Sequence, residues 1–141
     1  MRPKAKGNIA VAKAIYYFSL RNYYVFSPIG DDGGTVDLIV SLDGFTLHRV
    51  QCKYSQKLQT SMHKRYPDSP VYQVDLRQVM GQPTVEGKRV SIMKYTDTSF
   101  DLLFVTTPTG DYLFNWQELC LTRGKPPTGI LIGKKMLKYK I

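Results

Sequence analysis

Three polar side chains on two neighbouring apolar segments have the types and the spacing that metal-assisted phosphate chemistry uses. Asp37 lies in the run VDLIV, and Gln51 and Lys53 lie in the run HRVQCKYS that follows it. A carboxylate and an amide offer the oxygen ligands that Mg²⁺ prefers, and an ammonium group beside them can stabilise charge on a phosphate. The alternative interpretation is that all three residues decorate the solvated face of an ordinary hairpin.

The alternation of side chains along a strand decides whether these groups can meet. Gln51 and Lys53 share one face of a strand over residues 46–54, and Cys52 faces the other way. An Asp-Gly pair at 43–44 is a strong hairpin signal. Folding the chain there brings Asp37 opposite the region of Gln51, so we expect the acid, the amide and the ammonium to point into one cleft.

A magnesium ion is the cofactor that fits this set best. Asp37 and Gln51 would supply side-chain oxygens, the main-chain carbonyl of Cys52 would supply a third, and a phosphodiester would supply others. Lys53 would then stand beside the metal, where it could stabilise charge on the phosphate or orient the attacking water. We expect Mn²⁺ to substitute for Mg²⁺.

The remaining sequence predicts the elements that would hold this site. A basic lead-in over residues 1–6 precedes a helix from Gly7 to Arg21, in which apolar residues recur at helical spacing, and Asn22 fits a left-handed cap. Further strands are expected in YYVFSPIG, at 35–42, in VYQVDLRQV, KRVSIMKY, SFDLLFVTT and YLFNW, with a polar loop at 56–70, a short helix in QELCL and a basic tail at 125–141.

The chain's size and charge restrict the class of protein and the partner. With 141 residues, 43% of them apolar and 22% charged, the sequence predicts one folded domain, and it contains no apolar run that approaches a membrane span. A net charge of +9 points to a polyanionic partner, although anionic membranes and acidic proteins also attract cations. We expect phosphate contacts from Lys57, Lys64 and Arg65 and base contacts from Arg77, Lys88 and Arg89.

The spelling of these segments resembles a known family. The helix KGNIAVAKAIYYF, the strand YYVFSPIGDD, then VDLIV and HRVQCKYS are similar to the PD-(D/E)XK nuclease superfamily. The resemblance is closer to the branch of group I intron-associated homing endonucleases of cyanobacterial type, whose second motif has Gln before x-Lys, as VQCK has here. The later segment YTDTSFDLLFVTTPTGDYLFNW also resembles that branch.

The resemblance implies an α/β fold with a restriction-endonuclease-like core, in which a central mixed β-sheet is flanked by helices. It implies Asp37 as the metal carboxylate, Gln51 in place of the usual acid and Lys53 as the catalytic lysine. It also implies magnesium-dependent cleavage of double-stranded DNA by a homodimer or homotetramer. Cys52 and Cys120 lie far apart without metal-ligand spacing, which indicates free thiols in a reducing cytosol. We therefore expect a cytoplasmic location, in a bacterium or a phage-infected cell.

One position departs from the family pattern. Many relatives carry a Glu on the first helix about four residues after the Gly, which here falls on Val11, and no acid occurs before Gly30. Asp31 and Asp32 lie on a neighbouring loop and could compensate. Two enzyme functions stay open, a homing endonuclease and a junction-resolving or repair nuclease, because the shape of the substrate is set by the geometry of the oligomer. A catalytically impaired DNA-binding module and a small RNA-binding protein are the alternatives from another class.

Overall fold

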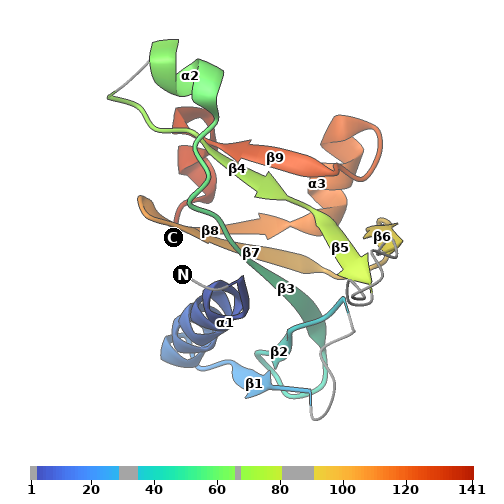
Figure 1. The fold of residues 1–141 in the computed structure, drawn as a ribbon. Helices are drawn as coiled ribbons and strands as arrows, with labels where there is room; N and C mark the ends of the chain where they lie inside the picture. Colours follow the sequence, from blue (N-terminus) through green and yellow to red (C-terminus); the bar gives the residue numbers. More distant parts are fainter. Residues whose placement is uncertain (1–2, 29–34, 66–67, 81–90) are drawn as a thin grey trace, which may run out of the picture.

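The computed structural model describes residues 3–28, 35–65, 68–80 and 91–141, and these form a mixed α/β fold (Figure 1). The helices are α1 (Pro3–Leu20), α2 (Thr60–Arg65), α3 (Trp116–Arg123) and the 3₁₀ helix η1 (Lys134–Tyr139). The strands are β1 (Tyr24–Phe26), β2 (Leu38–Ser41), β3 (His48–Tyr54), β4 (Tyr72–Asp75), β5 (Arg77–Met80), β6 (Ser91–Lys94), β7 (Leu102–Thr107), β8 (Gly110–Asn115) and β9 (Gly129–Ile132).

A central sheet of five strands has the order β1-β2-β3-β7-β8. The β3–β7 pair is parallel, with Val50 opposite Leu102, and the other three pairs are antiparallel. The central mixed sheet that the family resemblance implied is therefore confirmed. Two smaller pairs, β4–β9 and β5–β6, stand outside it.

The two faces of the central sheet are covered by different elements (Figure 1). Helix α1 covers one face, while the β4–β9 pair and α3 cover the other. Successive side chains of β3 and β7 point to opposite faces of the sheet. Val50 and Phe104 pack toward α1, whereas Leu103 and Val105 pack toward β4 and β9. The cluster on the α1 side consists of Ala10, Ala14, Phe18, Leu38, Val40, Val50, Cys52 and Phe104.

The first helix differs from the prediction at its start. It begins at Pro3 and not at Gly7, so most of the expected basic lead-in is helical. Proline is favourable in a first turn because its fixed φ suits a helix and its missing N–H has no partner to lose there. At the other end Asn22 adopts φ 62°, which confirms the left-handed cap.

The basic tail predicted at 125–141 is also folded. Strand β9 pairs antiparallel with β4, because the alternating residues Ile130 and Ile132 are buried against it. The chain then forms η1, and the main-chain N–H of Ile141 donates to the carbonyl of Asp111 at 3.0 Å.

The connection between β2 and β3 contains the predicted Asp-Gly turn but spans six residues, 42–47. The Asp43 carboxylate accepts hydrogen bonds from the main-chain N–H groups of Phe45 (2.8 Å) and Thr46 (2.7 Å). These bonds hold the pKa of Asp43 well below its usual range. Gly44 takes φ 84°, a conformation that favours glycine.

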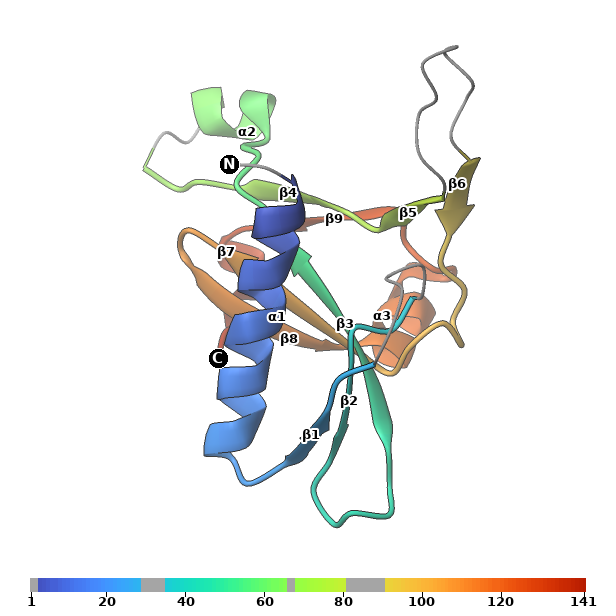
Figure 2. The same cartoon turned by 60° about the horizontal axis from the view of Figure 1, so that its bottom comes forward.

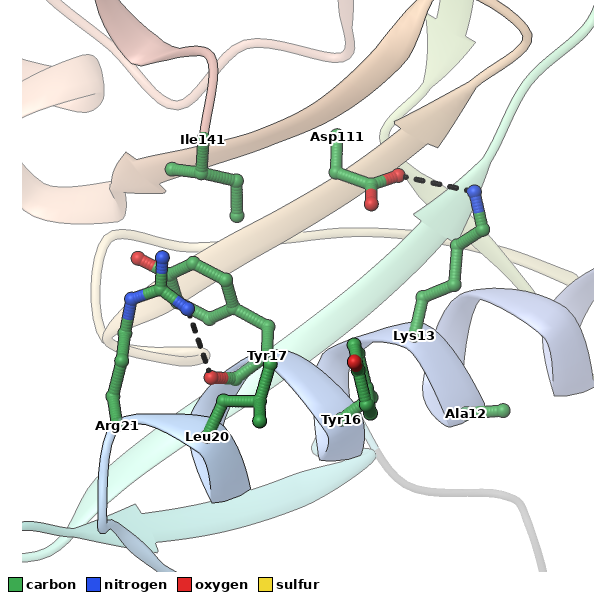
Figure 3. Close-up of a pocket in the computed structure, with 8 residues that line it drawn as sticks. All are labelled: Ala12, Lys13, Tyr16, Tyr17, Leu20, Arg21, Asp111 and Ile141. Atoms are coloured by element: carbon green, nitrogen blue, oxygen red, sulfur yellow. Dashed lines mark hydrogen bonds and ion pairs between the residues drawn. The ribbon is translucent and has the colours of Figure 1, made fainter.

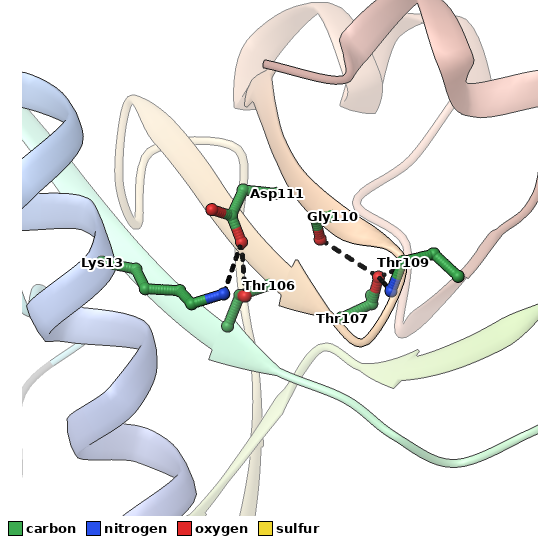
Figure 4. A network of polar contacts seen from close by, with 6 residues as sticks. All are labelled: Lys13, Thr106, Thr107, Thr109, Gly110 and Asp111. Carbon is green, nitrogen blue, oxygen red and sulfur yellow. Dashed lines mark hydrogen bonds and ion pairs between the residues drawn. The ribbon is translucent and has the colours of Figure 1, made fainter.

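A polar contact fastens α1 to the β7–β8 hairpin (Figure 4). The Lys13 ammonium lies 3.4 Å from Oδ1 of Asp111, and the hydroxyl of the buried Thr106 donates to the same oxygen. A surface pocket of about 480 Å³ adjoins this contact and is lined by Ala12, Lys13, Tyr16, Tyr17, Leu20, Arg21, Asp111 and Ile141 (Figure 3). Among the described residues, no helix combines the length and apolar character needed to cross a membrane.

Candidate active site

Asp37 is fixed at the start of β2, against the middle of β3. Its main-chain N–H donates to the carbonyl of Val50, and its carboxylate oxygen Oδ2 accepts from the N–H of Cys52, both at 2.8 Å. The ladder pairs Leu38 with Val50, so Asp37 comes opposite Gln51. Residues directly opposite in an antiparallel pair share a face, which places the carboxylate beside the amide as the sequence predicted.

Gln51 has an unusual environment for an amide. The residue is 7% exposed, and its Oε1 is buried without a hydrogen-bond partner. Its Nε2 donates to the carbonyl of Cys52 at 3.3 Å. The N–H and C=O of one strand residue point to the same side. The Cys52 carbonyl therefore points toward the edge where Asp37 lies, and it accepts a hydrogen bond from the Gln51 amide.

Lys53 lies on the same face as Gln51 and is half-buried. Its Nζ donates to the carbonyl of Arg77 at 3.4 Å and lies 5.2 Å from the centre of the Tyr95 ring. Burial lowers the pKa of Lys53, and the carboxylates of Asp75 and Asp37 oppose that shift. The Lys53 ammonium thus interacts electrostatically with Asp37 and with Asp75 of β4.

Two residues of this environment were not predicted from the sequence. Tyr95, which follows β6, is 4% exposed, and burial together with the charges of Asp37 and Asp75 raises its pKa. Asp75 at the end of β4 forms a forked ion pair with Arg77, Nε to Oδ1 at 3.0 Å and Nη2 to Oδ2 at 3.1 Å. The available signal was an acid and an arginine two residues apart, within a segment that we interpreted as one strand and that divides at Leu76.

The oxygen atoms of the candidate site are ligands that suit a hard cation, but together they carry little negative charge. In the ranges that the structure describes, no three His, Cys, Asp or Glu side chains group together as a metal site. The available ligands are one carboxylate, one buried amide oxygen and one main-chain carbonyl, which are oxygens of the kind that Mg²⁺ and Mn²⁺ take. The unpartnered Oε1 of Gln51 is the observation that favours such an ion, since a buried polar atom normally has a partner.

Val11 and Cys52 have structural contacts on the α1 side of the sheet. Val11 is partly buried against the apolar cluster there, and the sequence of α1 contains no acid. The buried Cys52 thiol belongs to the same cluster, and burial raises its pKa, so only its main chain faces the site. At the position where many relatives carry a first-helix acid, this chain therefore has an apolar side chain, Val11, that packs against the core.

The predicted DNA contacts lie on several different elements of the fold. Lys57 follows β3 and is exposed, as are Lys64 and Arg65 on α2. Arg77 begins β5, at the opposite end of β4 from α2 (Figures 1 and 2). Lys88, Arg89, Asp31 and Asp32 lie outside the described residues.

A family model and a solved structure are similar to this chain. The family model described as PD-(D/E)XK endonuclease matches residues 1–116. Among solved structures, the bacterial homing endonuclease I-Ssp6803I superposes with a TM-score of 0.68 at 23% sequence identity, over 94% of this chain and 78% of that chain. No curated protein matches the chain in sequence.

Proposed function

We propose, from the premise that the chain belongs to the PD-(D/E)XK endonuclease family, that it cleaves duplex DNA as a magnesium-dependent, site-specific endonuclease of the homing type. The observation that carries the proposal is the buried, unpartnered Oε1 of Gln51 on the strand face that Asp37 and Lys53 share. The similarity to I-Ssp6803I, a homing endonuclease, supports the choice of the homing type over a junction-resolving or repair nuclease.

Asp37, Gln51 and the Cys52 carbonyl would hold the metal. A bound Mg²⁺ supplies Lewis-acid polarisation of the phosphodiester and lowers the pKa of a bound water. The Asp37 carboxylate keeps its orientation because the Cys52 N–H donates to it at 2.8 Å. The Lys53 ammonium presents positive charge toward the phosphate and can orient the attacking water.

The partner is double-stranded DNA, held by the basic residues Lys57, Lys64, Arg65 and Arg77. A homodimer or homotetramer would bring one such site to each strand, and the cytoplasm of a bacterium or a phage-infected cell is the place where this substrate occurs. Replacing Lys64 with Ala removes one phosphate contact. The slope of the logarithm of affinity against the logarithm of salt concentration should then fall by about 0.9 in magnitude.

A second candidate function is a DNA-binding protein that has lost cleavage. The specific observation in its favour is the low charge of the site, where Val11 replaces the first-helix acid and Gln51 is neutral. One carboxylate holds a divalent ion less strongly than two or three would. The two candidates differ in whether the site binds a metal ion and cleaves.

A plasmid assay separates the two candidates. Supercoiled DNA is incubated with the protein at increasing Mg²⁺ or Mn²⁺, beside Lys53→Met and, as a matched control, the exposed lysine of η1 in Lys135→Met. The endonuclease predicts metal-dependent nicking or linearisation that Lys53→Met reduces about 100- to 10,000-fold and Lys135→Met leaves unchanged. Salt-sensitive DNA binding without any metal-dependent cut would refute the nuclease and favour the binding protein.

A further inference from the structure

Lys53 is held from the side of the β5–β6 pair by two contacts. Its Nζ donates to the carbonyl of Arg77 at 3.4 Å and lies 5.2 Å from the Tyr95 ring centre. Arg77 pairs with Lys94 at the end of this ribbon, and Tyr95 is the next residue. Both contacts therefore come from neighbouring positions of one two-stranded unit, and the family's metal-ligand pattern includes neither of them.

The Tyr95 ring is itself fixed in place. It is 4% exposed and packs edge-on against Phe100 and Trp116, with ring centres 5.1 Å and 6.3 Å away. The Trp116 indole donates to the carbonyl of Thr96 at 2.8 Å, which ties the chain next to Tyr95 to the core. A ring held this way presents a constant π-face to a cation, which attracts the Lys53 ammonium.

The Arg77 carbonyl is fixed by the corner between β4 and β5. The Asp75 carboxylate accepts from the main-chain N–H of Arg77 at 3.1 Å as well as from its guanidinium. Leu76 between them is fully buried, and its N–H donates to the carbonyl of Thr128 at 3.0 Å. Both supports of Lys53 are thus rigid, and they come from strands that are distant in sequence from β3.

We infer that Tyr95 is a positioning residue for Lys53, and that the Asp75–Arg77 corner is its second support. A lysine side chain is long and flexible, and it loses much rotamer entropy when it is ordered. Two rigid contacts order the ammonium before DNA arrives, which matters because a misplacement of about 1 Å can slow a reaction about 100-fold. The inference rests on the proposed function, in which Lys53 acts on the phosphate.

The test uses Tyr95→Leu, Tyr95→Phe and the control Phe100→Leu in the full chain. The control makes a similar reduction in the same aromatic cluster but keeps the Tyr95 ring. Two quantities are measured, the single-turnover cleavage rate at saturating DNA and the order parameter of the Lys53 Cε by ¹³C relaxation. The dissociation constant for DNA in Ca²⁺ is recorded beside them, because a positioning role should change the rate and leave binding unchanged.

We expect Tyr95→Leu to slow cleavage about 100-fold and to lower the Lys53 order parameter. Tyr95→Phe should keep the cleavage rate and the order parameter of the wild type, because it keeps the ring. Phe100→Leu should lower the melting temperature and change the cleavage rate and the Lys53 order parameter less than Tyr95→Leu does, because it keeps the Tyr95 ring. An unchanged Lys53 order parameter in Tyr95→Leu, or an equal effect of Phe100→Leu, would overturn the inference. If Tyr95→Leu fails to fold, Asp75→Ala, a change at an exposed carboxylate, must still lower the order parameter.

The relaxation measurement separates this inference from the proposed function. If the wild-type protein does not cleave DNA, the proposed function fails, yet the order parameter still reports whether Tyr95 orders Lys53. A loss of order in Tyr95→Leu alone then supports the positioning contact in a protein without nuclease activity.

Discussion

Gln51 offers the sharpest test of the metal hypothesis. If its buried oxygen is a metal ligand, that oxygen destabilises the folded protein when no cation is bound, and its removal should then stabilise the fold. Gln51 is 7% exposed and its Oε1 has no hydrogen-bond partner. Gln51→Met keeps the length of the side chain and removes both polar atoms. We predict that this variant is more stable than the wild type in the absence of divalent ions.

The magnitude follows from the two polar atoms of the amide. A buried, unsatisfied oxygen costs about 1–3 kcal/mol, whereas a net hydrogen bond contributes about 0.5–1.5 kcal/mol. The bond from Nε2 to the Cys52 carbonyl is long, at 3.3 Å, and belongs at the low end of that range. The difference favours the variant by about 1 kcal/mol, which corresponds to a rise in melting temperature of about 3 °C for a chain of 141 residues.

Thermal unfolding with and without Mg²⁺ or Mn²⁺ measures the effect. The wild type should gain melting temperature as the ion is added, because an ion that binds the folded state stabilises it. Gln51→Met should start higher and respond less. Gln73→Met, at an exposed position of β4, is the matched control and should change the unfolding free energy by less than about 0.5 kcal/mol.

Two results would refute this reasoning. A loss of stability in metal-free Gln51→Met would mean that the amide has a structural partner, and the unpartnered oxygen would no longer support a metal site. A full response of the variant to Mg²⁺ would mean that the ion binds elsewhere on the protein.

Three further predictions concern the scaffold. The fold lowers the pKa of Asp43, so the stability that the Asp43 carboxylate contributes is present above its ordinary pKa of 3.8 and is lost as the pH falls below that value. The unfolding free energy of Asp43→Asn should therefore fall less steeply with acid than that of the wild type. Trp116→Phe should cost about 2 kcal/mol in urea unfolding, since a fully buried indole loses its bond to Thr96, and a cost near zero would contradict that contact. Gly124→Ala should lower the stability by about 1 kcal/mol, because Gly124 caps α3 with φ 74°. Gly7→Ala, inside α1 with open space around it, should raise the stability by about 0.5–1 kcal/mol. Equal effects in calorimetry would contradict the left-handed cap at Gly124.

The pairing of Asp37 with Gln51 could be predicted because a strand repeats every two residues and the Asp-Gly turn limits where the chain reverses. A two-residue turn at 43–44 would have placed Asp37 opposite Val50. The six-residue connection observed shifts the register by one residue and places Gln51 there. The neighbourhood was therefore predictable, but its register depended on the hydrogen bonds of Asp43 within the turn.

The contacts of Lys53 could not be predicted in the same way. Tyr95 and the Arg77 carbonyl reach it from a ribbon that is separated from β3 by more than twenty residues, and only tertiary packing brings them together. The division of VYQVDLRQV at Leu76 likewise depends on a partner, since β4 pairs with β9 and β5 pairs with β6. Local alternation predicts a strand there but does not identify its neighbours.

The parallel pairing of β3 with β7 has an evolutionary consequence. The chain leaves the central sheet after Tyr54 and returns at Leu102, so everything between them is an excursion inserted between two adjacent strands. Related proteins could differ in that excursion, and with it in the surface that we propose contacts DNA, provided that a replacement keeps the pairing of β4 with β9. For the proposed endonuclease, a chimera built this way should lose cutting efficiency unless the transplanted stretch brings its own aromatic ring to the place of Tyr95.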